Sequence, residues 1–218
     1  MTDNIFVLSE SNSIGNRFLS ELRNTAVQAD RMRFRRNMER LGEILAYEIS
    51  RKFSYTDSGV ATPLGKKKMS LPAEDPVLIG ILRAGIPFLQ GFVNYFDYAD
   101  VGFVGAYRQE GASEISVQID YLSIPEVEGR RVILIDPMLA TGRSVVDAVK
   151  TISAKGTPAH IFIVSVVSAP EGIERVRNHI SLPFSLWTCA VDEKLNASSY
   201  IVPGLGDAGD LSYGIRAQ

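Results

Sequence analysis

Short apolar runs, each long enough for one buried strand, recur along this chain and alternate with segments of helical periodicity. An apolar run without polar alternation is typical of a strand that is covered on both faces of a parallel sheet. Alternating strands and helices therefore predict an α/β fold, with a mostly parallel sheet that is flanked by helices and joined by right-handed crossovers. The predicted strands are residues 77–82, 101–106, 132–135, 161–169 and 185–191.

The stretch VILIDPMLATGRSVVDAVK, residues 132–150, leads from one of these strands into a helix through a turn of small and hydroxyl residues. Such a turn leaves backbone N–H groups free at the helix start, where phosphate binds well. Many α/β proteins have turns of this kind that bind nothing, so the turn alone leaves phosphate binding open. Ligands of parallel sheets bind beyond the carboxyl ends of the strands, and Asp136, Arg83 and Arg108 all lie there.

The bulk properties limit the classes of protein to which the chain can belong. Its 218 residues suit a single α/β domain, residues 1–218, with a large core. The net charge of −2 argues against a general nucleic-acid binder, which is usually basic. One cysteine, Cys189, cannot form an internal disulfide. With no signal-peptide pattern and no apolar run of membrane-spanning length, we expect a cytoplasmic protein without membrane contact.

A helix over residues 30–53 is predicted by apolar residues that recur three or four positions apart. These residues are Phe34, Met38, Leu41, Leu45 and Ile49. The other face of this helix carries Arg31, Arg33, Arg35, Arg36 and Arg40. Because the total charge is acidic, we interpret the arginines as a solvated face or a subunit contact rather than as an RNA-binding surface.

Three further segments have patterns of their own. Residues 60–68 suggest a short hairpin or loop beside the core. Residues 107–123 are polar with alternating apolar positions, which predicts a protruding two-stranded hairpin of the kind that often serves as a mobile lid. Residues 195–218 are rich in glycine and are predicted to form an irregular tail.

Two nucleotide-binding motifs and a zinc site are disfavoured by their context. Residues 204–209, GLGDAG, match the dinucleotide fingerprint, but they follow a proline and too few residues remain for the long helix that this motif needs. Gly65 and Lys66 lack the first glycine of a phosphate-binding Walker loop. His160 and His179 lack the spacing of zinc ligands. We expect His179 at the surface near a helix end and Cys189 as an inert core residue.

Five short segments carry a resemblance to a known family. They are ILRAG, AYRQE, DPMLATGRS, APEG and YIVPGLGDAGD, spread over about residues 81–214. Together they resemble the type I phosphoribosyltransferases, and within these the uracil phosphoribosyltransferases, for which the tail segment is the most specific. The resemblance implies the type I phosphoribosyltransferase fold with a hairpin lid. It also implies pyrimidine salvage, in which uracil and 5-phospho-α-D-ribose 1-diphosphate (PRPP) give UMP and diphosphate, with Mg²⁺ as the cofactor.

The resemblance also implies roles for individual residues. The PRPP loop would consist of Asp136, Pro137, Met138, Leu139, Ala140, Thr141, Gly142, Arg143 and Ser144. Asp136 would accept hydrogen bonds from the ribose hydroxyls, and Arg83 and Arg108 would neutralise the diphosphate. The uracil-binding residues would be Ile201, Gly206, Asp207 and Ala208.

Asp207 would in addition contact PRPP and hold Mg²⁺ through water. Asp136, Arg108 and Asp207 are therefore the expected catalytic residues. The chain departs from the family at Arg143, where a second glycine is usual, and in residues 120–122, which lack an expected lysine.

Family members form dimers or larger assemblies, so we expect a homo-oligomer, a dimer or a tetramer, and GTP is a candidate effector. Two alternatives stay open. One is an RNA-binding attenuator of pyrimidine operons on the same fold, for which the arginines of residues 31–40 are the candidate surface. That group usually has two adjacent acids at the PRPP loop, whereas this chain has Asp136 followed by Pro137. The other is a different base, such as hypoxanthine or orotate, which the tail disfavours.

Overall fold

The computed structural model describes residues 4–108 and 117–215 and contains a central sheet with the strand order β1-β10-β9-β7-β4-β5-β6, in which β8 also pairs with β9. Among the described strands of this sheet, only β6 runs antiparallel to its neighbour, β5, so the prediction of a mostly parallel sheet is confirmed. The strands are β1 (Ile5–Val7), β4 (Val77–Leu82), β5 (Asp100–Arg108), β6 (Val117–Ser123), β7 (Arg131–Ile135), β8 (Met138–Leu139), β9 (His160–Ser168) and β10 (Phe184–Val191).

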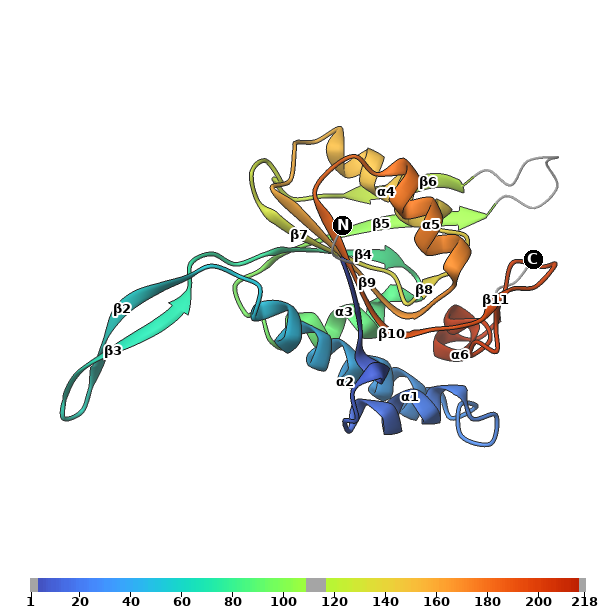
Figure 1. The fold of residues 1–218 in the computed structure, drawn as a ribbon, viewed down its shortest axis with the longest axis horizontal. Helices are drawn as coiled ribbons and strands as arrows, with labels where there is room; N and C mark the ends of the chain where they lie inside the picture. The colour runs from blue at the N-terminus through green and yellow to red at the C-terminus, as the bar shows by residue number, and fades with distance from the viewer. Residues whose placement is uncertain (1–3, 109–116, 216–218) are drawn as a thin grey trace.

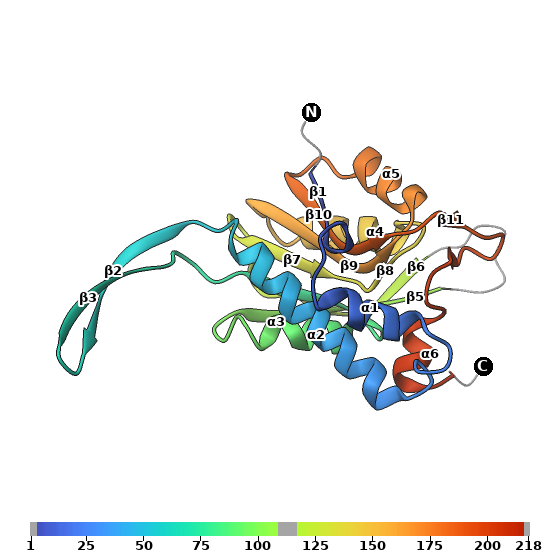
Figure 2. The ribbon, with the colours of Figure 1, turned by 60° about the horizontal axis from the view of Figure 1, so that its bottom comes forward.

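Helices cover both faces of this sheet, as Figures 1 and 2 show. One face carries α1 (Gly15–Arg23), α2 (Arg31–Ser50) and α3 (Gly85–Val93), while the other carries α4 (Arg143–Ser153) and α5 (Pro170–His179). Each face has its own apolar cluster, and the strands contribute to both. Buried on both faces, the central strands have the continuous apolar runs from which the sequence predicted them. A short 3₁₀ helix, η1 (Leu8–Glu10), links β1 to α1.

The predicted helix over residues 30–53 is confirmed as α2, three residues shorter at its end. Asp30 caps the helix, since its carboxylate accepts a hydrogen bond from the backbone N–H of Arg33 at 3.0 Å. The five apolar residues that defined the periodicity are completely or almost completely buried. Within the described part of the chain, no helix is long and apolar enough to cross a membrane.

The segment predicted as a short hairpin beside the core is a longer hairpin that projects from the body, so this prediction was wrong in length and position. It consists of β2 (Tyr55–Thr62) and β3 (Gly65–Pro72), and every residue of both strands is exposed. Figure 1 shows it extending away from the side that carries the C-terminal tail. Arg131, at the start of β7, forms an ion pair with Glu74 and donates a hydrogen bond to Ser54 Oγ at 2.9 Å. These contacts hold the base of the hairpin at the amino ends of the central strands.

The tail is more regular than the sequence predicted. A small antiparallel pair, β11 (Lys194–Leu195) and β12 (Ile201–Val202), leads into a short helix, α6 (Ala208–Tyr213). Asp207 caps this helix by accepting a hydrogen bond from Asp210 N at 2.9 Å. The abundant glycines obscured these elements, because they lower both helix and strand propensity.

Candidate active site

The residue that the sequence placed at the centre of the site, Asp136, directly follows β7 at the carboxyl edge of the sheet. Its backbone N–H donates to Val164 O at 3.1 Å, which continues the pairing of β7 with β9. Its Oδ1 accepts a weak hydrogen bond from Met138 N at 3.3 Å. The half-buried carboxylate is therefore held at the start of the predicted PRPP loop.

The first half of that loop is attached to β9 by its main chain. Pro137 O accepts hydrogen bonds from the N–H groups of Val166 and Val167, at 2.9 and 3.1 Å, and Leu139 O accepts one from Ala169 N at 2.9 Å. The side chains of Pro137 and Leu139 are buried. The half-buried residues Met138, Ala140, Thr141, Arg143 and Ser144 alternate with or follow them. The loop is thus a fixed part of the sheet edge.

The second half of the loop enters α4 through Gly142, which is the N-cap residue and has a φ of +74°. A β-carbon at this position would lie 2.8 Å from the carbonyl oxygen of Gly172, at the start of α5. A β-carbon on Gly172 would in turn lie 2.4 Å from Ala140 O. The close contact between the two main chains thus explains why the APEG segment has a glycine at position 172. The first N–H groups of α4 have no acceptor within the helix, so the turn has donors for an anion.

Arg83, beyond the end of β4, faces the tail. Its Nη2 lies 3.3 Å from Gly214 O, to which it donates, and 3.5 Å from Asp210 Oδ1. Its Nε is buried and, among the described residues, has no hydrogen-bond partner. A buried N–H group of a guanidinium without an acceptor is costly, so this site is suited to an anionic ligand.

Asp207 and Arg83 come close together at the tail turn. A β-carbon on Gly209 would lie 3.1 Å from Asp207 Oδ1 and 3.9 Å from Arg83 Nη2. Asp207 and Gly206 are exposed, whereas the side chains of Ile201 and Ala208 are buried in the core. The two buried side chains anchor the turn against the core.

The structure describes part of the segment that the sequence predicted as a lid. β5 and β6 form an antiparallel pair with an irregularity between Gly105 and Ala106, which confirms the two-stranded form. Arg108 is the last residue of β5, and its main chain is paired with that of Val117. Residues 109–116 of the predicted lid lie outside the described residues.

The residues expected to be inert behave as such. Burial raises the pKa of the Cys189 thiol far above its ordinary value, so the thiol is not a nucleophile. His179 ends α5 as an exposed residue, with its Nδ1 2.8 Å from Arg175 O. No group of three or more His, Cys, Asp or Glu side chains that could hold a metal ion occurs among the described residues.

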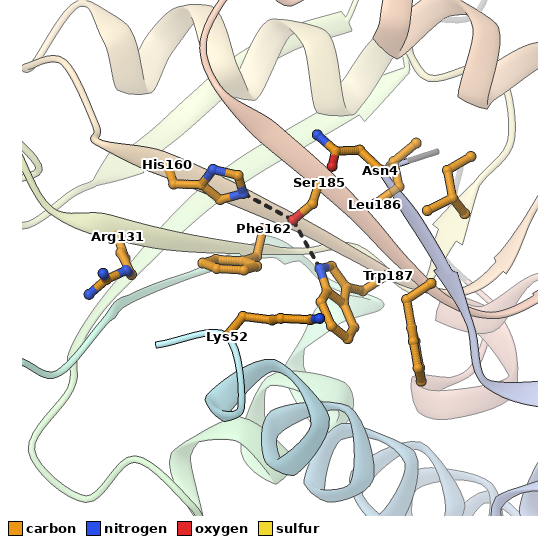
Figure 3. A pocket seen from close by; sticks show the side chains of 10 residues that line it. Asn4, Lys52, Arg131, His160, Phe162, Ser185, Leu186 and Trp187 are labelled. Carbon is orange, nitrogen blue, oxygen red and sulfur yellow. Dashed lines mark hydrogen bonds between the residues drawn. The ribbon is translucent and has the colours of Figure 1, made fainter. Parts of the chain in front are cut away.

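A separate cavity of about 540 Å³ lies at the opposite edge of the sheet, at the amino ends of β1, β7, β9 and β10. Figure 3 shows His160, Phe162 and Trp187 along it, with Lys52 reaching in from the end of α2. Ser185 Oγ accepts a hydrogen bond from Trp187 Nε1 at 3.0 Å and lies 3.0 Å from His160 Nε2. None of the residues predicted for the site lines this cavity.

One known protein family matches most of this chain. The family model described as uracil phosphoribosyltransferase matches residues 10–215. The chain belongs to the uracil phosphoribosyltransferase family. The match reaches well before residue 81, so the family likeness includes the N-terminal segment that the motifs did not cover. The chain has the type I phosphoribosyltransferase fold, which confirms the expected mostly parallel sheet flanked by helices.

Named relatives agree with this assignment. The uracil phosphoribosyltransferase of Porphyromonas gingivalis is 45% identical over 208 residues, covering 95% of this chain and 96% of the relative. That of Methanothermobacter thermautotrophicus is 37% identical over 183 residues, covering 83% of each chain. The solved structure of the AQ2163 protein from Aquifex aeolicus superposes with a TM-score of 0.87 at 32% identity, covering 98% of this chain and 100% of that one.

Proposed function

We propose that this member of the uracil phosphoribosyltransferase family joins uracil to PRPP, giving UMP and diphosphate in pyrimidine salvage. The observation that carries the proposal is the convergence of the PRPP loop, Arg83 and the uracil-type tail at one edge of the sheet. In sequence the loop ends at residue 144 and the tail turn begins at residue 201, yet Arg83 and the loop follow the adjacent strands β4 and β7, and Arg83 contacts the tail.

Asp136 is proposed to bind the ribose hydroxyls and to stabilise the positive charge that develops on the sugar as diphosphate leaves. The turn at residues 140–144 would bind the 5′-phosphate, using N–H groups at the positive end of α4. Arg83 and Arg108 would neutralise the diphosphate. The part of Arg83 is supported by its buried Nε, which has no hydrogen-bond partner within residues 4–108 and 117–215.

Uracil would be bound by main-chain groups of the tail turn at Ile201 and Gly206–Asp207–Ala208. The side chains of Ile201 and Ala208 are buried in the core, so these two residues would contact a base through their main chains. An N–H group always donates and a carbonyl always accepts, so a turn of this kind has a fixed pattern.

Mg²⁺ is the proposed cofactor, and the residues present fit a metal that is bound mostly by substrate. Asp207 is exposed, and within the described part of the chain only its Oδ1 is engaged, by Asp210 N. The other oxygen can accept a hydrogen bond from a metal-bound water. Mg²⁺ keeps several waters and takes phosphate oxygens as ligands, so it would neutralise charge on the diphosphate here.

We propose that the chain acts as one catalytic domain, with residues 107–123 closing over bound PRPP to exclude water. Hydrogen exchange measured with and without PRPP should show slower exchange in β5 and β6 when PRPP is bound. Unchanged protection of both strands would contradict closure.

The regulatory alternative is disfavoured by the partners of the arginines on α2. Arg33 pairs with Glu21 at 3.0 Å and Arg36 with Glu39 at 2.6 Å, while Arg35 donates to Ser212 O at 2.8 Å. Arg40 lies over the ring of Phe18. Arginines that are paired within the molecule have less charge available for RNA. Their partners also show that this face is not simply solvated, while a subunit contact stays a proposal.

A homo-oligomer is the proposed assembly, with the hairpin β2–β3 contacting a second copy. The hairpin exposes several apolar side chains. It projects away from the rest of the subunit, so few contacts within the subunit stabilise it (Figure 1). A cytoplasmic location fits the single buried thiol. GTP remains a candidate effector that follows from family likeness alone.

The decisive experiment mixes the protein and PRPP with Mg²⁺ and each of uracil, cytosine, hypoxanthine and orotate, and follows nucleotide formation. UMP as the main product supports the proposal. Another nucleotide would establish a different base specificity, and no product at all would contradict an enzymatic role.

A further inference from the structure

The tail turn is held by two side chains that lie far from it in sequence and outside the predicted site. Arg23, the last residue of α1, and Asp192, just beyond β10, form a two-pronged ion pair with N–O distances of 2.7 and 2.8 Å. The Asp192 side chain is only 6% exposed and that of Arg23 is 24% exposed. This is a largely buried pair rather than a surface contact.

Both partners also bind the main chain of the same tail residue, Gly204. Asp192 Oδ2 accepts a hydrogen bond from Gly204 N at 2.8 Å, and Arg23 Nη1 donates to Gly204 O at 2.9 Å. Gly204 has a φ of +59°, so it sits at the bend that redirects the chain toward residues 206–208. The donor and the acceptor of this residue are both engaged, which fixes its position and its orientation.

A neighbouring contact extends the same support. Gln28 Nε2 donates to Leu205 O at 3.1 Å and to Leu22 O at 2.7 Å, so the turn is tied to the segment after α1 as well. Ion pairs with little exposure are expensive to desolvate and often add nothing to stability, compared with apolar residues of the same shape. In this protein both side chains of the pair bind the main chain of Gly204, so the pair orients the chain that enters the tail turn.

We propose that Arg23 and Asp192 are positioning residues for uracil, which act through Gly204 to hold the main chain of residues 206–208 where it meets the base. Neither side chain needs to touch the substrate. This inference rests on the proposed function, because it assigns the tail turn to uracil. A backbone pattern discriminates between bases only when it is held still, so the pair supports selectivity as well as affinity.

The test compares Arg23→Met and Asp192→Asn with Arg17→Met, a matched control that removes an exposed arginine from the same helix. Displacement of the turn should raise KM for uracil roughly ten- to a hundredfold in the first two variants. KM for PRPP should rise much less than KM for uracil, because Asp207 is the one residue of this turn that is assigned to PRPP, whereas the PRPP loop itself is attached to β9 and α5. The discrimination between uracil and cytosine should fall in parallel, and Arg17→Met should match wild type.

Arg23→Lys keeps the charge but loses the planar fork, so it should fall between wild type and Arg23→Met. The double variant Arg23→Met/Asp192→Asn should lose little more than either single one, because both act on one turn. Equal KM values for uracil in Arg23→Met and Arg17→Met would overturn the proposal. A parallel rise in both KM values together with a lower Tm would also overturn it, since that pattern is general loosening of the fold. If the wild-type protein forms UMP and the variants have the same KM for uracil, this inference alone is refuted. If the wild-type protein forms no UMP, the proposed function is refuted.

Discussion

The peptide of Gly172 lies directly against the peptide of Ala140, so closely that a β-carbon on Gly172 would stand 2.4 Å from Ala140 O. The start of α5 thus serves as the surface on which the PRPP loop rests. Loop position is therefore set by a glycine that contacts no substrate in the proposed arrangement.

Gly172→Ala should push the loop away from α5 and raise KM for PRPP by about tenfold or more, because a misplaced anion site loses several hydrogen bonds together. KM for uracil should change much less. Steady-state kinetics with each substrate varied in turn provide the measurement. Gly59→Ala is the control, since a β-carbon there meets nothing within 4 Å. Equal effects of the two substitutions would mean that α5 does not support the loop.

Asp136→Asn keeps the shape of the side chain and removes its charge. Turnover should fall roughly ten- to a thousandfold, the scale for loss of one electrostatic stabiliser of a transition state. Asp147→Asn, which changes a carboxylate on α4 that pairs with Lys150, should leave turnover near wild type. Near-normal turnover of Asp136→Asn at saturating substrates would remove this residue from the mechanism.

Uracil should be preferred over cytosine by roughly 30-fold to more than 10⁴-fold in kcat/KM, because cytosine would leave two main-chain groups unsatisfied at about 1–3 kcal/mol each. Uracil has an acceptor at position 4 and a donor at ring nitrogen 3, and cytosine reverses both. 5-Fluorouracil keeps the same edge and should remain a substrate. Comparable kcat/KM values for uracil and cytosine would show that the tail turn does not select the base.

His160 predicts a pH dependence of stability. Burial, and secondarily the charge of Arg131, lower the pKa of this imidazole below its ordinary value of about 6.5. The unfolded chain therefore binds more protons than the folded one just below that pH. The free energy of unfolding should fall as the pH drops through this range, and His160→Gln should flatten the dependence. Denaturant unfolding at several pH values measures it, and identical curves would exclude a contribution from His160.

The exposed hairpin β2–β3 leads to a prediction about the oligomeric state of the protein in solution. Replacing Val60 and Met69 by lysine should shift the assembly toward monomers, because both apolar side chains are exposed on β2 and β3. Sedimentation measures the mass, and far-UV circular dichroism checks that the fold is kept. An unchanged mass would place the subunit contact elsewhere. Ser70→Lys, on the other face of the same hairpin, is a control for added charge.

Sequence patterns predicted the elements whose burial follows a period. The central strands and α2 were found because their buried positions must be apolar and regularly spaced. Asp136 and the turn after it were found because polar residues at a strand end stand out against an apolar run. Asp192 follows β10 in the same way, and that signal could have identified it.

Other features of the structure are not marked by any local sequence pattern. The hairpin β2–β3 is exposed on both faces, so no alternation marks its length. β1 and α1 are short, and their apolar residues are too few to show a period. The pairing of Arg23 with Asp192 spans 169 residues, and nothing local to either one reveals it. Tertiary geometry, rather than local pattern, decides contacts of this kind.

Cys189 gives the protein a practical property. It is the only cysteine in the sequence, and its thiol is enclosed in the core and held in its protonated form. Maleimides and iodoacetamides react with exposed thiolates, so the folded protein has no native target for them. A cysteine introduced at an exposed position, such as Gly59 on the hairpin, would carry a fluorophore or spin label at one known place, without prior removal of the native cysteine.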